Sequence, residues 1–216
     1  MAGRHLLLCR VGIVDKSRAV LHLSPRSQPV FHPKRPVPYA ALPLAEAELK
    51  RLQELGVLVP VSYSDWAAPM VVVKKLSDWI RVCADFSTGL NAVLTPNCYP
   101  LPVPTDLLTL LNGVTCFAKL VLADAYLQIE VAPESRELFT INTHRGLSQY
   151  TRPHFGVKTA PALFQQTMNA MLSGIPGTAG YLDYMIIVGR SPAELQDRVC
   201  AVLERVQEYG FRLRSD

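Results

Sequence analysis

The sequence lacks three features that would each define a class of protein: a long apolar run, paired cysteines and an extreme net charge. No apolar stretch approaches the roughly 18 residues that a membrane-spanning helix needs, so no membrane contact is expected. The cysteines number five, and none belongs to a C-x-x-C pair. Neither a disulfide framework nor a zinc site is therefore predicted, and reduced thiols are expected in an intracellular protein of the cytoplasm or nucleus.

The apolar N-terminal run "LLLCRVGIV" contains an arginine, Arg10, and no small-residue cleavage site follows it. It is predicted to be a strand or a frayed end rather than a signal peptide. The net charge of +4 permits a polyanionic partner without requiring one. Hydrophobic residues make up 49% of the 216 residues, which suffices for the core of one large domain or two small ones.

Prolines dominate the stretch "SPRSQPVFHPKRPVPYA" and exclude a regular helix there. An extended arm or an edge strand is expected, and its cations indicate either a solvated arm or a phosphate contact. Helices are predicted in "PLAEAELKRLQELG", in "TDLLTLLNG" with Thr105 as its cap, in "TAPALFQQTMNAML", and in "SPAELQDRVCAVLERVQEYG". The last has Ser191 as its cap, Pro192 at its first position and Gly210 beyond its end.

Strands are predicted in seven short runs of alternating or β-branched residues. They are "VLVPV", "PMVVVKK", "WIRVCADF", "CFAKLVL", "LQIEV", "LFTINT" and "LSQYTR". The segment "GYLDYMIIVG" is predicted to form two further strands folded about a tight turn. Strands and helices in mixed order, without internal repeats, indicate an α+β fold.

Eight segments in this order resemble the reverse transcriptases of Ty3/gypsy-like retrotransposons with long terminal repeats. They are "PVFHPKRPVPYA", "GVLVPVSYSDWAAPMVVVKK", "IRVCADFSTGLN", "YPLPVPTDLL", "LNGVTCFAKLVLADAYLQIEV", "ESRELFTINTHRGL", "FGVKTAPALFQQTMNAML" and "GYLDYMIIVGR". The resemblance implies the fingers and palm of a right-hand polymerase, with an antiparallel palm sheet and flanking helices. Residues 1–35 would form an extended arm. Fingers would occupy about 36–95 and 129–154, and palm about 96–128 and 155–216, with the thumb absent.

The family places three aspartates around two Mg²⁺ ions, one from a strand and two from a Y-x-D-D turn. This sequence has Val121 at the first position, Asp183 at the second and Tyr184 at the third. Valine offers no ligand atom, and a tyrosine phenol with an ordinary pKa near 10 binds Mg²⁺ poorly at neutral pH. Asp183 is thus the only candidate metal ligand and catalytic carboxylate at the three positions.

Other positions match family residues that contact the incoming nucleotide. Lys75 and Arg81 would contact the triphosphate from the fingers, as Asp124 and Ala125 would from the backbone of the palm. Tyr126 would stack under the sugar, and Phe155 would contact the nucleotide. On residue type alone, the two cations would be solvated and Tyr126 would be a core aromatic. Asp85 resembles a structural carboxylate, and weaker resemblance suggests contacts to the template for Gln165 and Gln166.

The family motif L-P-F-G here reads "PHFG", with Pro153 and His154 in the first two positions. His154 could be read as a new base, but drift explains it together with Val121 and Tyr184. The prediction is a reverse-transcriptase-like domain that lacks metal-dependent polymerase activity, and the resemblance implies RNA/DNA template–primer and dNTP as its partners. The alternatives are a weakly active polymerase fragment, a residual nucleic-acid-binding or interaction module, and a remnant without function.

Overall fold

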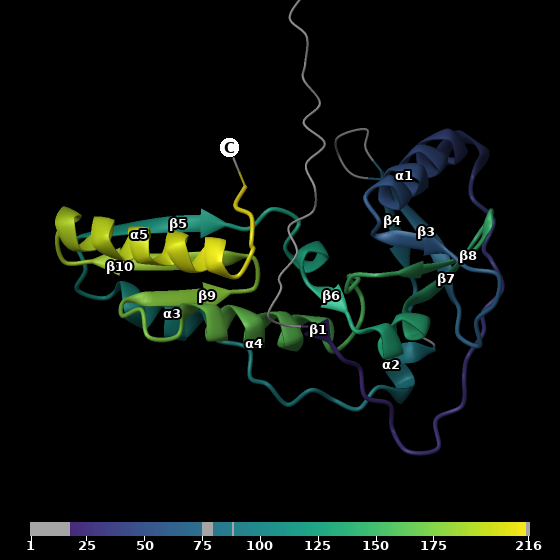
Figure 1. The fold of residues 1–216 in the computed structure, drawn as a ribbon, viewed down its shortest axis with the longest axis horizontal. Helices are drawn as coiled ribbons and strands as arrows, with labels where there is room; N and C mark the ends of the chain where they lie inside the picture. The colour runs from purple at the N-terminus through teal and green to yellow at the C-terminus, as the bar shows by residue number, and fades with distance from the viewer. Residues whose placement is uncertain (1–17, 75–79, 88, 215–216) are drawn as a thin grey trace, which may run out of the picture.

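The computed structural model describes residues 18–74, 80–87 and 89–214. Figure 1 shows two groups of elements joined near the middle of an elongated molecule. One group, in the left half of the view, contains β5, β9, β10, α3, α4 and α5. The other contains α1, α2, β2, β3, β4, β7 and β8, and the short strands β1 and β6 lie between the groups.

The first group is built on a three-stranded antiparallel sheet with the order β5-β10-β9. Its strands are β5 (Cys116–Val121), β9 (Thr178–Tyr181) and β10 (Tyr184–Gly189). Its helices are α3 (Pro104–Leu111), α4 (Ala160–Leu172) and α5 (Pro192–Glu208). The expected strand–turn–strand form of "GYLDYMIIVG" is confirmed.

Alternation along β10 explains why this sheet has one buried face. Met185 and Ile187 are fully buried, whereas Tyr184 and Ile186 are only partly covered. The buried side chains pack against Phe164 and other apolar residues of α4 and α5. Burial of each such side chain contributes about 2 kcal/mol, so the register of β10 is strongly fixed.

Helix α5 begins and ends as the sequence predicts. The Ser191 hydroxyl accepts a hydrogen bond of 3.2 Å from the Glu194 N–H, and Pro192 occupies the first turn. Gly210 has a φ of 77°, the left-handed conformation that ends helices and that glycine adopts without strain. Val202 and Val206 then face the core.

The second group is built on a five-stranded mixed sheet with the order β2-β8-β7-β3-β4, in which β3 and β7 run parallel. Helix α1 (Leu42–Glu54) packs on this sheet through Leu49 and Leu52, and a single-turn helix α2 (Leu90–Val93) follows β4. The strands are β2 (Leu58–Pro60), β3 (Ala68–Lys74), β4 (Ile80–Ala84), β7 (Thr140–Thr143) and β8 (Gly146–Tyr150).

A pair of two-residue parallel strands, β1 (Arg18–Ala19) and β6 (Glu130–Val131), lies where the two groups meet. Three 3-10 helices complete the described elements: η1 (Tyr39–Ala41), η2 (Ala125–Gln128) and η3 (Pro133–Phe139). Buried Arg152 is 3.6 Å from Glu130, and Arg18 approaches the same carboxylate at 3.6 Å. One acidic side chain thus connects β1, β6 and the segment after β8.

Two local predictions differ from the structure. The strand expected in "LQIEV" shrinks to Glu130–Val131, because residues 125–128 form η2 and Gln128 is buried. Thr105 lies inside α3, which begins at Pro104, so Thr105 is not its cap. The prolines of 24–38 do exclude helix, and Phe31 makes one bridge to Ala67 there. The run "LLLCRVGIV" lies outside the described residues.

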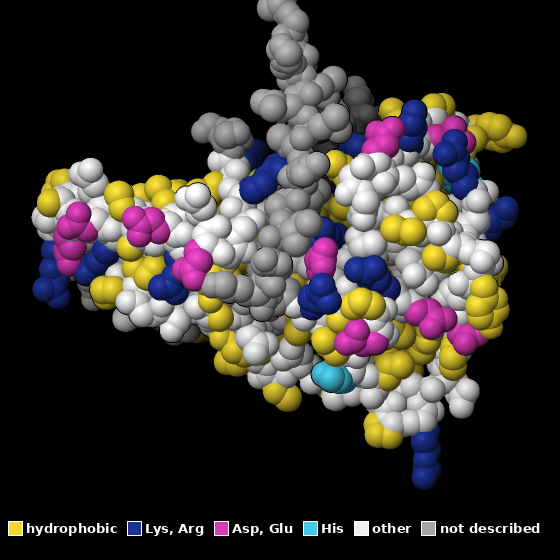
Figure 2. All heavy atoms as spheres, in the orientation of Figure 1, with side chains coloured by type: hydrophobic (Ala, Val, Ile, Leu, Met, Phe, Trp, Pro, Cys, Tyr) yellow, Lys and Arg dark blue, Asp and Glu magenta, His cyan; other side chains and the backbone are white. Residues whose placement is uncertain are grey.

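No helix in the described ranges is long and apolar enough to cross a membrane. The four cysteines in those ranges, Cys83, Cys98, Cys116 and Cys200, are free thiols. Figure 2 shows one face of the molecule, on which Lys and Arg side chains are scattered over both groups among Asp and Glu. This face therefore carries no single basic stripe of the kind that marks many nucleic-acid-binding surfaces.

Candidate active-site cavity

The β9–β10 hairpin places Asp183 at its turn. Tyr181 and Tyr184 form the last pair of the two strands, and Leu182 and Asp183 connect them. Leu182 has a φ of 49°, a left-handed conformation that costs a non-glycine residue of order 1 kcal/mol or more. Such a turn needs support from outside the hairpin.

Gln165 on α4 supplies that support. Its side chain is completely buried, donates 2.7 Å to the Gly180 carbonyl and accepts 2.9 Å from the Leu182 N–H. It also donates to Asn169, which donates in turn to the Tyr99 hydroxyl. The expectation that Gln165 faces the template is therefore wrong, whereas Gln166 is exposed. The sequence did not indicate this contact, because a glutamine on an amphipathic helix carries no signal of a buried bond to a distant turn.

Val121 lies beside this turn, at the end of the neighbouring strand. The register pairs Tyr184 with Val121, and the Asp183 carbonyl accepts 2.7 Å from the Leu122 N–H. Paired residues of antiparallel strands point to the same face, so Tyr181, Tyr184 and Val121 form one row across the sheet. The sequence predicted that these positions meet.

The row continues beyond β5 into the segment after α5. Leu122 and Leu213 form an antiparallel bridge, and the Arg214 N–H donates 2.8 Å to the Val121 carbonyl. Leu213 packs into the same core as Leu122. Arg214 therefore follows Val121 in register, on the face of the row. Sequence analysis missed this contact, and the alternation in "FRLR" was the one signal that could have indicated a strand-like segment.

A cavity of about 630 Å³ opens at this row and gathers most of the expected site residues. It is lined by Arg81, Val121, Leu122, Ala123, Asp124, Ala125, Tyr126, Phe155, Leu182, Asp183 and Arg214. Tyr184 is next to the cavity but is not among its lining residues. Lys75 lies outside the described residues.

Aromatic rings and a cation form one side of the cavity. The rings of Tyr126 and Phe155 meet edge to face with centroids 5.0 Å apart, and Tyr126 also contacts Phe164 at 5.1 Å. The Arg81 guanidinium lies 4.9 Å from the Phe155 ring centroid. Burial raises the pKa of Tyr126, and the Asp183 charge raises it further, so its phenol stays protonated.

Asp124 follows β5 rather than extending it. Its φ of 44° is left-handed, its side chain is exposed, and its carbonyl accepts 2.8 Å from the Leu127 N–H. Because β5 ends at Val121, the alternation of side chains along that strand does not determine where the Asp124 side chain points. Asp124 lines the cavity from a tight turn.

The donor set does not fit a pair of Mg²⁺ ions. The positions 121, 183 and 184 hold one carboxylate, and no group of three or more His, Cys, Asp or Glu side chains suited to a metal occurs within the described ranges. The Tyr184 ring lies 4.6 Å from the Lys119 ammonium and 5.9 Å from the Tyr181 ring. Position 184, where the resemblance implies an anionic ligand, is thus occupied by a ring packed against a second ring and a cation.

His154 is buried outside this cavity. Its Nδ1 lies 2.5 Å from the Phe155 carbonyl, and its ring is 4.5 Å from that of Tyr150. Burial lowers the pKa of His154, so the ring is neutral at physiological pH. It borders a smaller cavity of about 140 Å³ with Glu48, Arg51 and Arg81. Because His154 is buried, it is not exposed to a substrate as a catalytic base would be.

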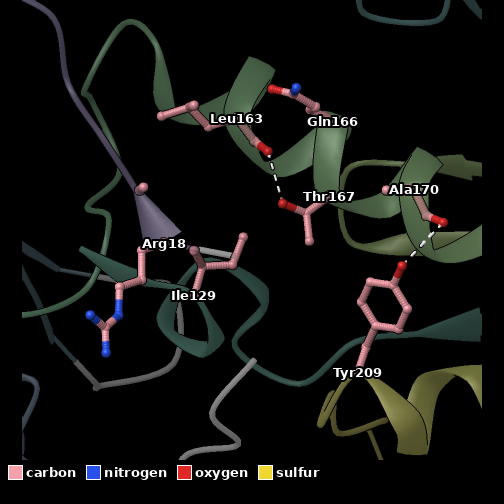
Figure 3. A pocket seen from close by; sticks show the side chains of 8 residues that line it. Arg18, Ile129, Leu163, Gln166, Thr167, Ala170 and Tyr209 are labelled. Atoms are coloured by element: carbon pink, nitrogen blue, oxygen red, sulfur yellow. Dashed lines mark hydrogen bonds between the residues drawn. The ribbon is translucent and has the colours of Figure 1, made fainter. Parts of the chain in front are cut away.

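A further cavity of about 460 Å³ lies between α4, β1 and the end of α5. Figure 3 shows Thr167 turned back to the Leu163 carbonyl, and Tyr209 reaching across to the Ala170 carbonyl. The Arg18 guanidinium points away from α4. The hydrogen bonds drawn in this cavity join α4 to itself and to Tyr209, the residue that follows α5.

A two-part α+β fold with a Tyr-Leu-Asp turn at the sheet end, beside a cavity lined by aromatic and charged side chains, is the architecture of a right-hand polymerase. Residues 69–216 match the family model described as reverse transcriptase (RNA-dependent DNA polymerase). The chain belongs to the reverse transcriptase family.

Curated relatives come from animals and yeast. An uncharacterized Caenorhabditis elegans protein, K02A2.6, is 46% identical over 208 residues, covering 95% of this chain and 16% of that protein. The Pol polyprotein of Drosophila melanogaster transposon 412 is 28% identical over 198 residues, covering 88% of this chain and 16% of that polyprotein. The Schizosaccharomyces pombe transposon Tf2-3 polyprotein is 31% identical over 147 residues, covering 67% of this chain and 11% of that polyprotein. The chain therefore spans a small part of each relative.

Solved structures show the same fold. A prototype foamy virus protease–reverse transcriptase matches with a TM-score of 0.84 and 20% identity, covering 94% of this chain and 27% of that one. A foamy viral enzyme in complex with RNA/DNA hybrid matches with a TM-score of 0.82 and 17% identity, with the same coverage. The expected α+β polymerase fold is thereby confirmed.

Proposed function

We propose that the chain is a reverse-transcriptase-like domain of retrotransposon origin that has lost metal-dependent polymerisation. Its fingers would comprise residues 36–95 and 129–154, and its palm residues 96–128 and 155–216. Residues 1–35 would be an arm. The retrotransposon polyproteins among its relatives support the origin. The cavity would be the nucleotide site, with Lys75 and Arg81 from the fingers, and Asp124, Ala125, Tyr126 and Phe155 beneath the nucleotide.

One observation carries the proposed loss of activity. Asp183 is the only carboxylate among the three positions that the family uses to hold its ions, and Val121 and Tyr184 face each other beside it. Two-ion catalysis offsets the charge that develops on the attacking and leaving oxygens. A single carboxylate cannot hold and space two ions, so the rate enhancement that depends on them would be lost.

Nucleic-acid binding is a second candidate function that can survive the loss of catalysis. Foamy viral reverse transcriptases of this fold are known in complexes with RNA/DNA hybrid and with double-stranded DNA. The open face of the palm sheet carries Phe117, which is 65% exposed, Lys119 and the Tyr181–Tyr184 pair. Rings and a cation on an open sheet suit contact with bases and phosphates.

Primer extension on an RNA template tests the proposed loss. We expect no extension by the purified chain with either Mg²⁺ or Mn²⁺, at enzyme concentrations up to that of the primer. The Asp183→Ala variant serves as the matched background, because it removes the remaining carboxylate. Template-dependent extension that disappears in Asp183→Ala would refute the proposal and favour the weakly active polymerase.

A further inference from the structure

An arginine lies in the row of residues that the family uses for its metal ligands. Tyr184, Val121 and Arg214 follow one another across the sheet, fixed by the β5–β10 register and by the 2.8 Å bond from the Arg214 N–H to the Val121 carbonyl. Arg214 lines the cavity together with Asp183. The place where the family concentrates negative charge therefore has an arginine residue next to it in the sheet.

The cavity as a whole is balanced in charge. Its ionisable lining at neutral pH consists of two arginines, Arg81 and Arg214, and two aspartates, Asp124 and Asp183. The arginines come from separate parts of the fold, β4 and the segment after α5. Arg81 is also stacked against Phe155, which orients its planar group. Two guanidinium groups on separate elements can contact different phosphates of one chain of phosphates.

This balance of charges determines whether a phosphate ligand needs a bound cation. Carboxylates packed around a triphosphate repel it, and bound cations are required to overcome that repulsion. With a valine and a tyrosine in place of two carboxylates, this repulsion is reduced, and the two arginines offset the charge of Asp124 and Asp183. The arginines can then contact the phosphate oxygens directly, with bidentate geometry that Mg²⁺ would otherwise compete for.

We propose that this cavity binds the triphosphate of a nucleotide without a divalent ion, and that Arg214 is one of its phosphate contacts. The inference rests on the proposed function, because it takes the cavity to be the family's nucleotide site. The Tyr126–Phe155 pair would contact the sugar and base, as the aromatic side of the cavity allows. Arg81 and Arg214 would hold the phosphates from two sides.

Isothermal titration of the full chain tests this directly. The ligands are a deoxynucleoside triphosphate and inorganic triphosphate, each titrated in EDTA and again in Mg²⁺. We expect the nucleotide to bind in EDTA at least as tightly as in Mg²⁺, since the ion would mask the charge that the arginines contact. Inorganic triphosphate should compete but bind more weakly, because it lacks the sugar and base. Equal affinity would show a polyphosphate site without nucleotide recognition and overturn the nucleotide assignment.

Four variants assign the contacts. Arg214→Ala and Arg81→Ala should each weaken binding in EDTA about ten-fold, the loss expected for a charge-assisted hydrogen bond. Arg190→Ala is the matched control, because Arg190 is exposed and follows Gly189, at the other end of β10 from the turn. Val121→Asp should weaken binding in EDTA and make it depend on Mg²⁺. Melting curves establish that each variant is folded. If Arg214→Ala is not folded, Arg214→Lys provides a milder substitution.

Besides equal affinity for nucleotide and inorganic triphosphate, three results would overturn the inference: binding that requires Mg²⁺ in the unaltered chain, no binding at millimolar nucleotide, or equal affinity in Arg214→Ala and Arg190→Ala. Each is distinguishable from failure of the proposed function, which primer extension reports separately. A chain that neither extends primers nor binds nucleotide would leave the lost polymerase standing and remove only the metal-free nucleotide site.

Discussion

Val121 and Tyr184 lie directly opposite each other on neighbouring antiparallel strands, and the turn carrying Asp183 begins where their pairing ends. The three positions that the proposed function takes as ligand positions are thus brought together by β5 and β10, and two of them hold valine and tyrosine. The 2.7 Å bond from the Leu122 N–H to the Asp183 carbonyl ties the turn to the strand. Ligand identity and ligand placement can therefore be tested separately.

Restoring the carboxylates should create an Mg²⁺ site. The variant Val121→Asp/Tyr184→Asp is expected to melt at a lower temperature than the unaltered chain in EDTA, because three adjacent carboxylates repel one another. Saturating Mg²⁺ should raise its melting temperature by roughly 5 to 10 °C, the shift expected when ligand exceeds its dissociation constant about a hundred-fold. The unaltered chain should show no such shift. Differential scanning fluorimetry measures both.

The variant Val121→Asn/Tyr184→Asn is the matched control, since it introduces side chains of similar size without charge. It should not respond to Mg²⁺. If the double aspartate variant also fails to respond, the backbone no longer places these positions as a metal centre requires, and substitution of the ligands alone does not explain the loss.

Replacing Gln165 should lower the free energy of unfolding more than replacing a polar residue on a helix surface usually does. Replacing it with leucine keeps the volume but leaves the Gly180 carbonyl and the Leu182 N–H without the buried partner that now bonds to them. Unsatisfied buried groups of this kind cost about 1–3 kcal/mol each, so Gln165→Leu should destabilise the chain by roughly 2–4 kcal/mol. Urea denaturation measures the change in the free energy of unfolding.

Gln166→Leu gives the comparison for this measurement. Gln166 is the next residue on α4 and is exposed, so its replacement should change the free energy of unfolding by about 0.5 kcal/mol or less. Equal effects of the two substitutions would mean that the amide of Gln165 does not hold the turn in solution.

The dependence of stability on pH should reveal the buried imidazole of His154. Burial lowers its pKa below the ordinary 6.5. Below that pH the unfolded chain takes up a proton that the folded chain does not, so stability is complete above pH 6.5 and falls as the pH decreases. The slope for one such group is at most about 1.4 kcal/mol per pH unit.

Urea denaturation between about pH 8 and pH 5 measures this slope. His154→Phe should flatten it, because a phenyl ring can keep the ring contacts with Tyr150 and Phe86 without titrating. His22→Gln, at an exposed position, should leave it unchanged. An unaltered slope in His154→Phe would place the acid sensitivity elsewhere.

Local patterns predicted the elements around the site because they are strongly periodic. The alternation of β10 and the cap, proline and glycine of α5 each carry their own signal. The second half of η2, Leu127 and Gln128, is part of the strand predicted in "LQIEV", because a short mixed run of apolar and polar residues fits either period. Its formation depends on buried Gln128, whose amide bonds to Ala123 and Arg212 from outside the segment.

The contacts that complete the site come from residues distant in sequence. Gln165 reaches Gly180 and Leu182 only after α4 packs on the hairpin, and Arg214 reaches Val121 only after α5 returns the chain to β5. The Gln165 contact has no local signature, because polar residues on helices usually face water, and for Arg214 the alternation in "FRLR" was the one local signal. Resemblance to the family predicted which positions meet, whereas tertiary packing determines what supports them.

Binding of an RNA–DNA hybrid should depend on Lys119, whose ammonium lies over Tyr184 on the open face of the palm sheet. If that face contacts phosphates, affinity must fall steeply as salt rises, because each contact releases a counterion. Lys119→Ala should weaken binding at low salt and reduce the slope of log affinity against log salt by about 1. Lys50→Ala is the control, since Lys50 lies on α1 and pairs with Glu54. Fluorescence anisotropy with a labelled hybrid measures both slopes. Equal slopes for the two variants would exclude Lys119 from the interface, and no binding by the unaltered chain at low salt would exclude the binding function itself.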